Sequence, residues 1–239
     1  MALTINGTTS GVSLKTDTSN IGLGANAVDS ITTGDYNVGV GDSALTAVTT
    51  GTENVAMGFE ALKTHTTGHS NVAIGQESLE NNTTASNNTA VGTKSLRANT
   101  TGHSLTSVGS LALLANTTGT QSTAVGHQAL TANTTGAENT GIGFQSLYTV
   151  TTGNYNTAVG GGALFNNTTA SNNTAVGKNA MRANTTGTEN SGFGRRALRY
   201  NTTGNNNIAI GEEALGSNTT ASNNTSVGWN SLAANTTGA

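Results

Sequence analysis

Residues 156–172 read NTAVGGGALFNNTTASN, and variants of this 17-residue unit fill the chain from residue 20 to residue 238. We number the unit from position 1 at Asn156. In the consensus, Asn-Thr-Ala-Val-Gly occupies positions 1–5, Ala-Leu positions 8 and 9, and Asn-Thr-Thr-Gly positions 12–15, while positions 6, 7, 10, 11, 16 and 17 are variable. The glycine of position 5 recurs in all 13 copies, as Gly24, Gly41, Gly58, Gly75, Gly92, Gly109, Gly126, Gly143, Gly160, Gly177, Gly194, Gly211 and Gly228. A period this strict indicates a stacked array of similar units.

The composition is poor in the residues that build an ordinary core. Only 33% of the 239 residues are hydrophobic and 4% are aromatic, which is low for a globular domain. Charge is scarce too, at 9%, whereas chains that are disordered through charge are rich in it. The apolar residues nevertheless keep register, at position 4 from Leu23 to Val227 and at position 9 from Val28 to Leu232. Such columns argue against low-complexity disorder.

The unit suits one coil of a β-solenoid, because 17 residues are too few for helical-pair repeats of about 33 residues or more. In residues 71–75, Val72 and Ile74 share one face of a strand. We expect them to form a first inward anchor and Ala-Leu to form the second. The glycine should end the strand through a positive φ or through close packing of a neighbouring backbone. Asn-Thr-Thr-Gly should close the coil as a turn.

The sequence therefore predicts an all-β fold, a parallel β-solenoid (β-roll) of 13 coils over residues 20–239. Residues 1–19 fall outside the register and are expected to form an N-terminal cap or a docking segment. The absence of proline fits this fold, because the N–H groups of each coil should pair with the next coil. One alternative stays open for the middle of the unit: a segment such as residues 212–215 could form one turn of helix.

Two further columns contain only small residues. Position 3 is always Ala, Gly or Ser, and position 8 is Ala or Ser. These columns indicate close approach, either inside one coil or against another copy of the chain. Two or three aliphatic side chains per unit bury little area, and at about 25 cal/mol per Å² they barely offset the cost of ordering the backbone. We therefore expect shared burial in an oligomer.

The repeat offers columns of similar residues, whereas catalysis needs dissimilar groups that converge in a pocket. There is no cysteine and no column of paired carboxylates, and the four histidines, His65, His69, His103 and His127, fall at three different positions. No aspartate recurs at a fixed position, as repeated calcium-binding turns would require. We predict a non-enzymatic protein with no catalytic residue, no cofactor and no metal site.

The charge balance and the N-terminal sequence bear on partners and location. The formal net charge is −3 with no long basic segment, so nucleic-acid binding is not expected. No apolar run approaches the roughly 18 residues that span a bilayer, and the first residues lack a basic leader. Membrane insertion is not expected, and a complete chain of this sequence would be made as a soluble cytoplasmic protein.

The variable positions should form the solvent face, because 19 of the 21 charged residues fall there. Five of the nine positive charges lie close together in sequence, and rings also occur at these positions, among them Phe59, Phe144, Tyr148, Phe165 and Tyr200. A basic cluster with neighbouring rings could bind an anionic polysaccharide or a phosphate. The alternative is a solvated face balanced by Glu189, Glu212 and Glu213. The candidate surface-binding residues are Lys178, Arg182, Arg195, Arg196, Arg199 and Trp229.

The strand segments NVAIG (71–75), NTAVG (88–92) and NIAIG (207–211) resemble the repeat of trimeric autotransporter adhesin heads, which form trimeric left-handed parallel β-rolls. The longer unit, from NTAVG at 156–160 through Ala163-Leu164 to Asn167-Thr-Thr, is similar to arrays in bacteriophage tail fibres and related bacterial fibre proteins. The resemblance covers residues 20–238. It implies a homotrimeric, fibrous attachment protein.

Autotransporter adhesins carry a secretion signal and a C-terminal membrane anchor, and this sequence shows neither. We therefore expect a phage tail fibre or another virion-surface appendage involved in host attachment, located on the virion. The expected partners are other particle or fibre proteins at its ends and a host surface glycan or receptor. A bacterial adhesin passenger fragment on the cell surface is one alternative. An ice-binding solenoid is another, because threonine pairs recur in every coil, although only one of two adjacent threonines should face outward.

Overall fold

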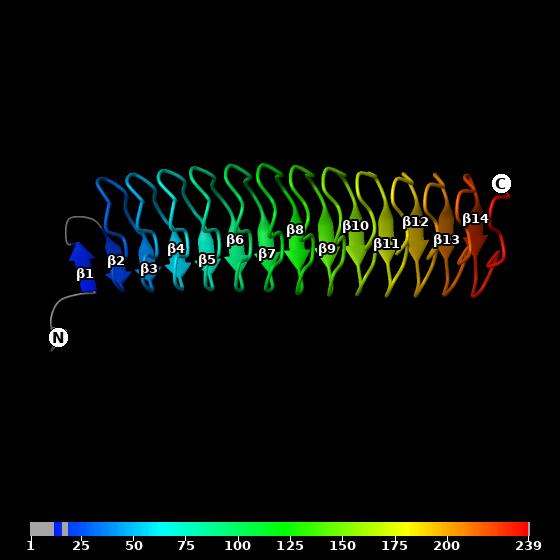
Figure 1. The fold of residues 1–239 in the computed structure, drawn as a ribbon, viewed down its shortest axis with the longest axis horizontal. Coiled ribbons are helices and arrows are strands. Elements are labelled where there is room, and N and C mark those ends of the chain that lie inside the picture. Colours follow the sequence, from blue (N-terminus) through cyan, green and yellow to red (C-terminus); the bar gives the residue numbers. More distant parts are fainter. Residues whose placement is uncertain (1–11, 16–18, 239) are drawn as a thin grey trace.

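The computed structural model describes residues 12–15 and 19–238. They form a rod whose coils follow one another in chain order, with β2 and β14 toward its opposite ends (Figure 1). The fold is all-β, a parallel β-solenoid with a 17-residue repeat, as the sequence predicts. Its strands are β1 (Val12–Lys15), β2 (Asn20–Leu23), β3 (Val38–Val40), β4 (Val55–Met57), β5 (Val72–Ile74), β6 (Thr89–Val91), β7 (Thr106–Val108), β8 (Thr123–Val125), β9 (Thr140–Ile142), β10 (Thr157–Val159), β11 (Thr174–Val176), β12 (Ser191–Phe193), β13 (Ile208–Ile210) and β14 (Thr225–Val227).

All 14 strands belong to one sheet in chain order. From β2 to β14 the pairing is parallel, and each residue lies beside the residue 17 places later, as Val55 lies beside Val72. Equivalent positions of the repeat therefore stack in columns along the rod. At the N-terminal edge, β1 pairs with β2 in the antiparallel direction. Of the cap or docking segment expected over residues 1–19, residues 1–11 and 16–18 lie outside the described residues.

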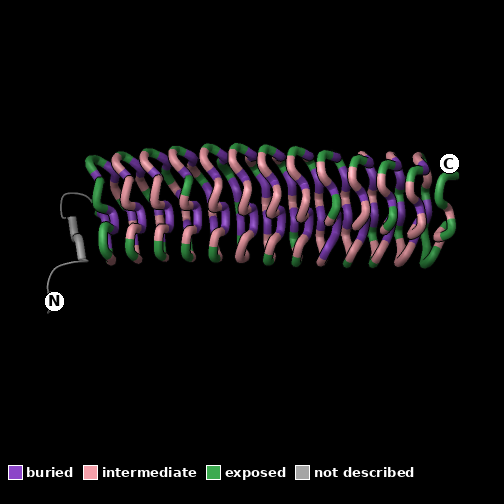
Figure 2. Tube along the Cα trace, in the orientation of Figure 1, coloured by how far each residue is buried: buried purple, intermediate pink, exposed green. Residues whose placement is uncertain are grey.

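The core consists of the position 9 column and the small residues opposite it. Leu45, Leu130 and Met181 are fully buried, and so are the alanines that precede them. Buried segments recur from coil to coil along the rod (Figure 2). The expectation that positions 2 and 4 point inward is wrong. In β5 the buried residue is Ala73 of position 3, whereas Ile74 is 38% exposed.

The width of the coil explains this inversion. A Cβ atom added to Gly39, at position 3 of β3, would lie 2.7 Å from Cγ2 of Val28 and 3.1 Å from the carbonyl oxygen of Ala44. The leucine column thus fills the interior, and only a small residue fits opposite it. Because side chains alternate along a strand, an inward position 3 places positions 2 and 4 outside.

Burial also decides between the two interpretations of the small columns. Ala56 of position 3 and Ala44 of position 8 are fully buried within the single chain. Their small size serves close approach inside one coil, and the hypothesis that these columns contact another copy is wrong.

The middle of the unit is not helical. Ser43 and Leu45, at positions 7 and 9, have φ angles of 59° and 52°, and these two positions are left-handed in every coil. The N–H of Ser43 donates to the carbonyl of Ala25 in the preceding coil, and that of Leu45 donates to Ala61 in the next. Hydrogen bonds between coils therefore replace the i to i−4 bonds of a helix. Each left-handed residue costs about 1–2 kcal/mol, which burial of the leucine and these bonds must offset.

The glycine of position 5 is required for both reasons considered above. Gly41 has a φ of 126°, and a Cβ atom there would lie 2.7 Å from the carbonyl carbon and oxygen of Gly58 in the next coil. A side chain at this position would meet backbone, which cannot move aside cheaply.

Asparagines form two buried ladders at the ends of the coils. At position 1, Nδ2 of Asn37 donates to Oδ1 of Asn20 at 3.0 Å and to the carbonyl of Gly51 at 2.8 Å. At position 12, Nδ2 of Asn116 donates to Oδ1 of Asn99 at 2.9 Å and to the carbonyl of Gly119 at 3.1 Å. The ladders satisfy turn carbonyls that would otherwise be buried without partners.

Candidate surface-binding site

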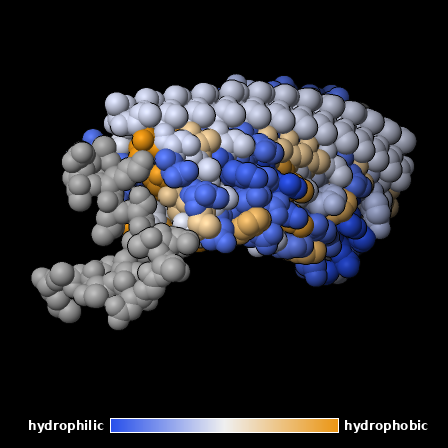
Figure 3. Space-filling model, turned by 60° about the vertical axis from the view of Figure 1, so that its left-hand side comes forward, coloured by the Kyte–Doolittle hydropathy of each residue, from blue (hydrophilic) through white to orange (hydrophobic). Residues whose placement is uncertain are grey.

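The candidate binding residues come from positions 6, 7 and 10, which lie outside the strands. Because the coils stack in register, residues 17 apart in sequence are neighbours on the surface. Figure 3 shows strongly hydrophilic residues gathered on one side of the rod, next to a band of near-neutral hydropathy that runs along its length. We define the aromatic-basic face as the set His127, Phe144, Tyr148, Phe165, Lys178, Arg182, Arg195, Arg196, Arg199 and Tyr200.

Rings and guanidinium groups stack along this face. The rings of Tyr148 and Phe165 lie 5.0 Å apart and nearly parallel, and the guanidinium of Arg182 lies 4.8 Å from the centre of the Phe165 ring. These three residues occupy position 10 in successive coils, so they continue one column. His127 stacks on Phe144 at 5.8 Å in the position 6 column. Such contacts hold the side chains in fixed orientations.

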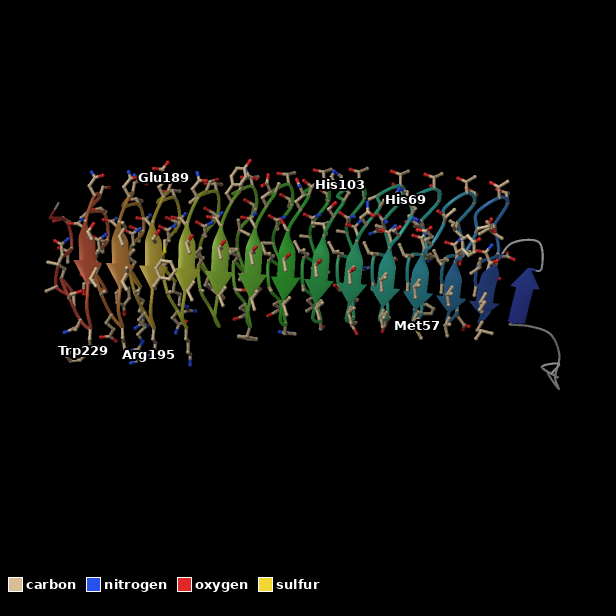
Figure 4. The ribbon with its side chains drawn as sticks, turned by 180° about the vertical axis from the view of Figure 1, so that it is seen from behind. Met57, His69, His103, Glu189, Arg195 and Trp229 are labelled. Carbon is tan, nitrogen blue, oxygen red and sulfur yellow. The ribbon has the colours of Figure 1, made fainter. Side chains whose placement is uncertain are left out.

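The positive charges fall into two groups. Arg195 pairs with Glu212, and Arg196 Nη1 lies 2.9 Å from Glu213 Oε1. For these two arginines the balanced-face alternative holds. In Figure 4, Glu189 lies at the opposite edge of the coil from Arg195, and no described ion pair involves it.

The second group of positive charges has no such balance. Within the described part of the chain, Lys178, Arg182 and Arg199 form no ion pair. By contrast, the other lysines and arginines of residues 19–238, which are Lys63, Lys94, Arg97, Arg195 and Arg196, all pair with glutamates. Three cations of this face are thus left to water or to a ligand.

Two hollows open where glycine replaces a side chain in these columns. The larger hollow, about 300 Å³, lies at Gly161 and Gly162. The smaller, about 160 Å³, lies at Gly216. The larger is lined by Phe144, Gln145, Gly161, Gly162, Phe165, Lys178, Asn179 and Arg182. The smaller is lined by Arg196, Arg199, Tyr200, Glu213, Gly216, Ser217, Asn230 and Ala233.

The structure brings Lys178 and Arg182 together at the larger hollow, and Arg196 and Arg199 at the smaller one. Arg195 lines neither of them. Trp229 is 77% exposed in the last coil, toward the C-terminal end of the rod (Figure 4).

The sequence analysis missed Gln145, Asn179 and the glycine pair as parts of a site. The sequence did contain a sign of this site, which is the pair Gly161 and Gly162 at two consecutive variable positions. The adjacent coils carry side chains at these positions, so the glycines leave a gap in the face.

The histidines do not gather. His69 and His103 lie at the edge opposite Arg195 (Figure 4), and the described residues contain no group of three side chains suited to hold a metal. His65 is buried in the position 12 ladder, where its Nε2 lies 2.9 Å from the carbonyl of Gly68 and its Nδ1 lies 3.2 Å from Nδ2 of Asn82. Burial lowers the pKa of His65 below its ordinary value. This histidine is a structural member of the ladder.

The two threonines of each turn have different roles. At position 13, Oγ1 of Thr100 donates to the carbonyl of Thr117 in the next coil at 3.0 Å. At position 14, the side chain of Thr101 is exposed, and an exposed threonine occupies this position in every coil. One uninterrupted column of threonines therefore faces solvent.

No family model, curated protein or solved structure matches the chain. Among the described residues, no helix is long and apolar enough to cross a membrane.

Proposed function

We propose that the protein is a non-enzymatic structural fibre, a homotrimer that serves as a phage tail fibre or another virion-surface appendage in host attachment. The observation that carries the proposal is the outward face of the strands, formed by positions 2 and 4. Position 4 is apolar in every coil, and position 2 is Ile or Val in five coils and Thr or Ser in the other eight. The described side chains of this face include no charged residue. The exposed large apolar side chains of this face are Ile21, Leu23, Met57, Ile74, Val108, Ile142, Phe193, Ile208, Ile210 and Val227.

Such a face needs a partner, because soluble monomers rarely expose continuous apolar patches larger than a few hundred Å². The columns repeat at the spacing of adjacent strands, about 4.8 Å, along 13 coils. A partner that covers them along the whole rod must have the same period, and another copy of this chain has it. The resemblance to trimeric β-rolls favours three copies around one axis. The aromatic-basic face lies outside the strands and would stay accessible. Each trimer would present three copies of it, which could bind a host surface with avidity.

Native mass, measured by light scattering after size-exclusion chromatography, tests the assembly. We expect about three times the 23.8 kDa of the chain. A mass near 23.8 kDa at micromolar concentration would overturn the trimer and leave a self-sufficient solenoid.

Attachment requires a separate test. Immunogold electron microscopy with an antibody against the rod should label fibres on virions, and the purified rod should compete with virions for host cells. Labelling of bacterial cell surfaces in the absence of phage would instead favour an adhesin passenger.

Ice binding remains a second candidate because of one observation, the uninterrupted column of exposed threonines at position 14. A rigid row of equally spaced hydroxyl and methyl groups is a surface that could match a lattice. Thermal hysteresis of the purified protein tests it. A freezing point equal to the melting point, at millimolar protein, would exclude this function.

A further inference from the structure

The hollow at Gly161 and Gly162 exists because one layer of side chains is missing. The preceding coil carries Phe144 and Gln145 at the same two positions, and the following coil carries Lys178 and Asn179. The resulting space of about 300 Å³ lies at the lower end of the range for ligand pockets, about 300–1,000 Å³. It can hold one ring-sized group.

The walls of the hollow combine apolar rings with positive charge. Phe144 and Phe165 contribute ring faces or edges, Lys178 and Arg182 contribute cations, and no lining residue is acidic. Neither cation has a carboxylate partner among the described residues, in contrast to the paired Arg195 and Arg196. The side-chain amide of Asn179 adds a neutral group that can both donate and accept hydrogen bonds.

The side chain of Arg182 is held in place by stacking, but one of its hydrogen-bond donors has no partner in the described part of the chain. Its guanidinium stacks on the Phe165 ring at 4.8 Å. Its Nε is buried and has no hydrogen-bond partner among the described residues. The point that a Cβ of residue 162 would occupy lies 3.8 Å from this Nε and 2.6 Å from Oδ1 of Asn179, which covers Gly162. A buried donor without a partner is costly, and a small rotation of the Arg182 side chain that presents Nε to a ligand acceptor in the hollow would relieve that cost.

We propose that this hollow binds a carboxylate-bearing sugar residue of an acidic surface polysaccharide. The aliphatic face of a pyranose ring packs on Phe144 and against the edge of Phe165, because Tyr148 and Arg182 already stack on the Phe165 ring. The carboxylate accepts hydrogen bonds from Arg182 and lies close to the ammonium group of Lys178. Hydroxyl groups exchange hydrogen bonds with Gln145 and Asn179. The proposal rests on the attachment function above and names the class of ligand that one face of the fibre would take.

Ligand-observed NMR tests this binding with sialyllactose, a hyaluronan tetrasaccharide and an oligogalacturonate, and with lactose and maltotriose as neutral controls. We expect saturation transfer to at least one acidic probe and none to the neutral ones. Gly161→Phe should abolish the signal by filling the hollow. Its fold should persist, because a Cβ at residue 161 has no neighbour closer than 3.8 Å and phenylalanine occupies the same position in the preceding coil. Ser110→Phe, in the same column three coils away, is the matched control and should bind like the unaltered protein.

Arg182→Gln should weaken binding of the acidic probe about tenfold or more, because it removes a charge-assisted hydrogen bond. The proposal is overturned if no acidic probe binds at millimolar concentration, if neutral probes bind equally, or if Gly161→Phe retains binding. The fibre function has separate readouts. If Gly161→Phe keeps the trimeric mass and still competes with virions, attachment does not depend on this hollow, and the proposed fibre function stands without it. If the protein is a monomer that nevertheless binds an acidic sugar at the hollow, the binding site stands and the trimeric fibre does not.

Discussion

Val150 follows Asn133 by one coil in the position 12 ladder and leaves Oδ1 of Asn133 buried, with no hydrogen-bond partner among the described residues. In the regular part of the ladder this oxygen accepts from the asparagine of the next coil, as Oδ1 of Asn99 accepts from Asn116. The valine thus gains apolar burial but interrupts a chain of amide hydrogen bonds.

Val150→Asn should not destabilise the protein and should raise its free energy of unfolding by roughly 0–1 kcal/mol. The new amide can donate to Asn133 and to the carbonyl of Gly153, and can accept from Asn167, and these bonds offset the lost burial of valine. Urea unfolding followed by circular dichroism measures the change.

Val48→Asn is the matched control, because Val48 is equally buried in the same column. Its neighbours there are Ile31 and His65, which offer no donor to the new oxygen. We expect a loss of about 1–3 kcal/mol. Equal effects of the two substitutions would refute the ladder argument.

Gly160→Ala should destabilise the rod by roughly 3 kcal/mol or more. Gly160 has a φ of 125°, and a Cβ atom there would lie 2.7 Å from the carbonyl carbon of Gly177. In Gly161→Ala, one residue later, the new Cβ makes only an ordinary contact, 3.8 Å from the carbonyl oxygen of Phe144, and stability should change by less than about 1 kcal/mol. Thermal unfolding of the two single variants compares them, and similar melting temperatures would contradict the requirement for glycine at position 5.

Acid should weaken the fold through His65. The buried ring is satisfied in its neutral form, because Nε2–H can donate to Gly68 while Nδ1 accepts from Asn82. Its pKa is lowered chiefly by burial, so the unfolded chain binds the proton more readily than the folded one. This contribution to stability is present above the unfolded pKa, about 6.5, and is lost progressively as the pH falls below it.

His65→Asn restores the ladder residue and should flatten the pH dependence between pH 7.5 and 5. His103→Asn, at an exposed position, should leave it unchanged. Unfolding midpoints in urea across this range measure both, and an unchanged slope in His65→Asn would assign the acid sensitivity to other groups.

Charge on the strand face should separate the subunits. Val125→Lys combined with Ile142→Lys places two ammonium groups in the proposed interface, and we expect the native mass to fall from about three chains to one while the β circular dichroism persists. Thr93→Lys with Ser110→Lys adds the same charge at position 6 and should leave the mass unchanged. A trimer that tolerates the first pair would exclude the strands as its interface.

The sequence predicted the features that depend on residue identity at fixed spacing. The glycine column and the buried Ala-Leu pair both follow from sterics and apolarity. Alternation in a strand defines two faces but not which one is inward, and Val72 and Ile74 were misplaced because their size suggested burial. The volume inside the coil decides the matter, and only the packed leucine column reveals it.

The left-handed backbone at positions 7 and 9 was beyond prediction for a related reason. Leucine is a poor occupant of that region, and it is held there by hydrogen bonds to adjacent coils such as that from Leu45 to Ala61. The hollow exists because two glycines lack side chains. The sequence does not show that Phe144, Phe165 and Arg182 surround that space, so the site could not be predicted from it.

Because every coil contains 17 residues in the same register, the rod can change its length without a change in its fold. Each coil contacts only its two neighbours, through the same columns, so removal or duplication of one complete unit would join residues that already fit. The length of the rod could therefore change in steps of about 4.8 Å while the contacts of the invariant columns stay the same. The length of the rod thus depends on the invariant columns, whereas the proposed ligand contacts depend on the variable positions.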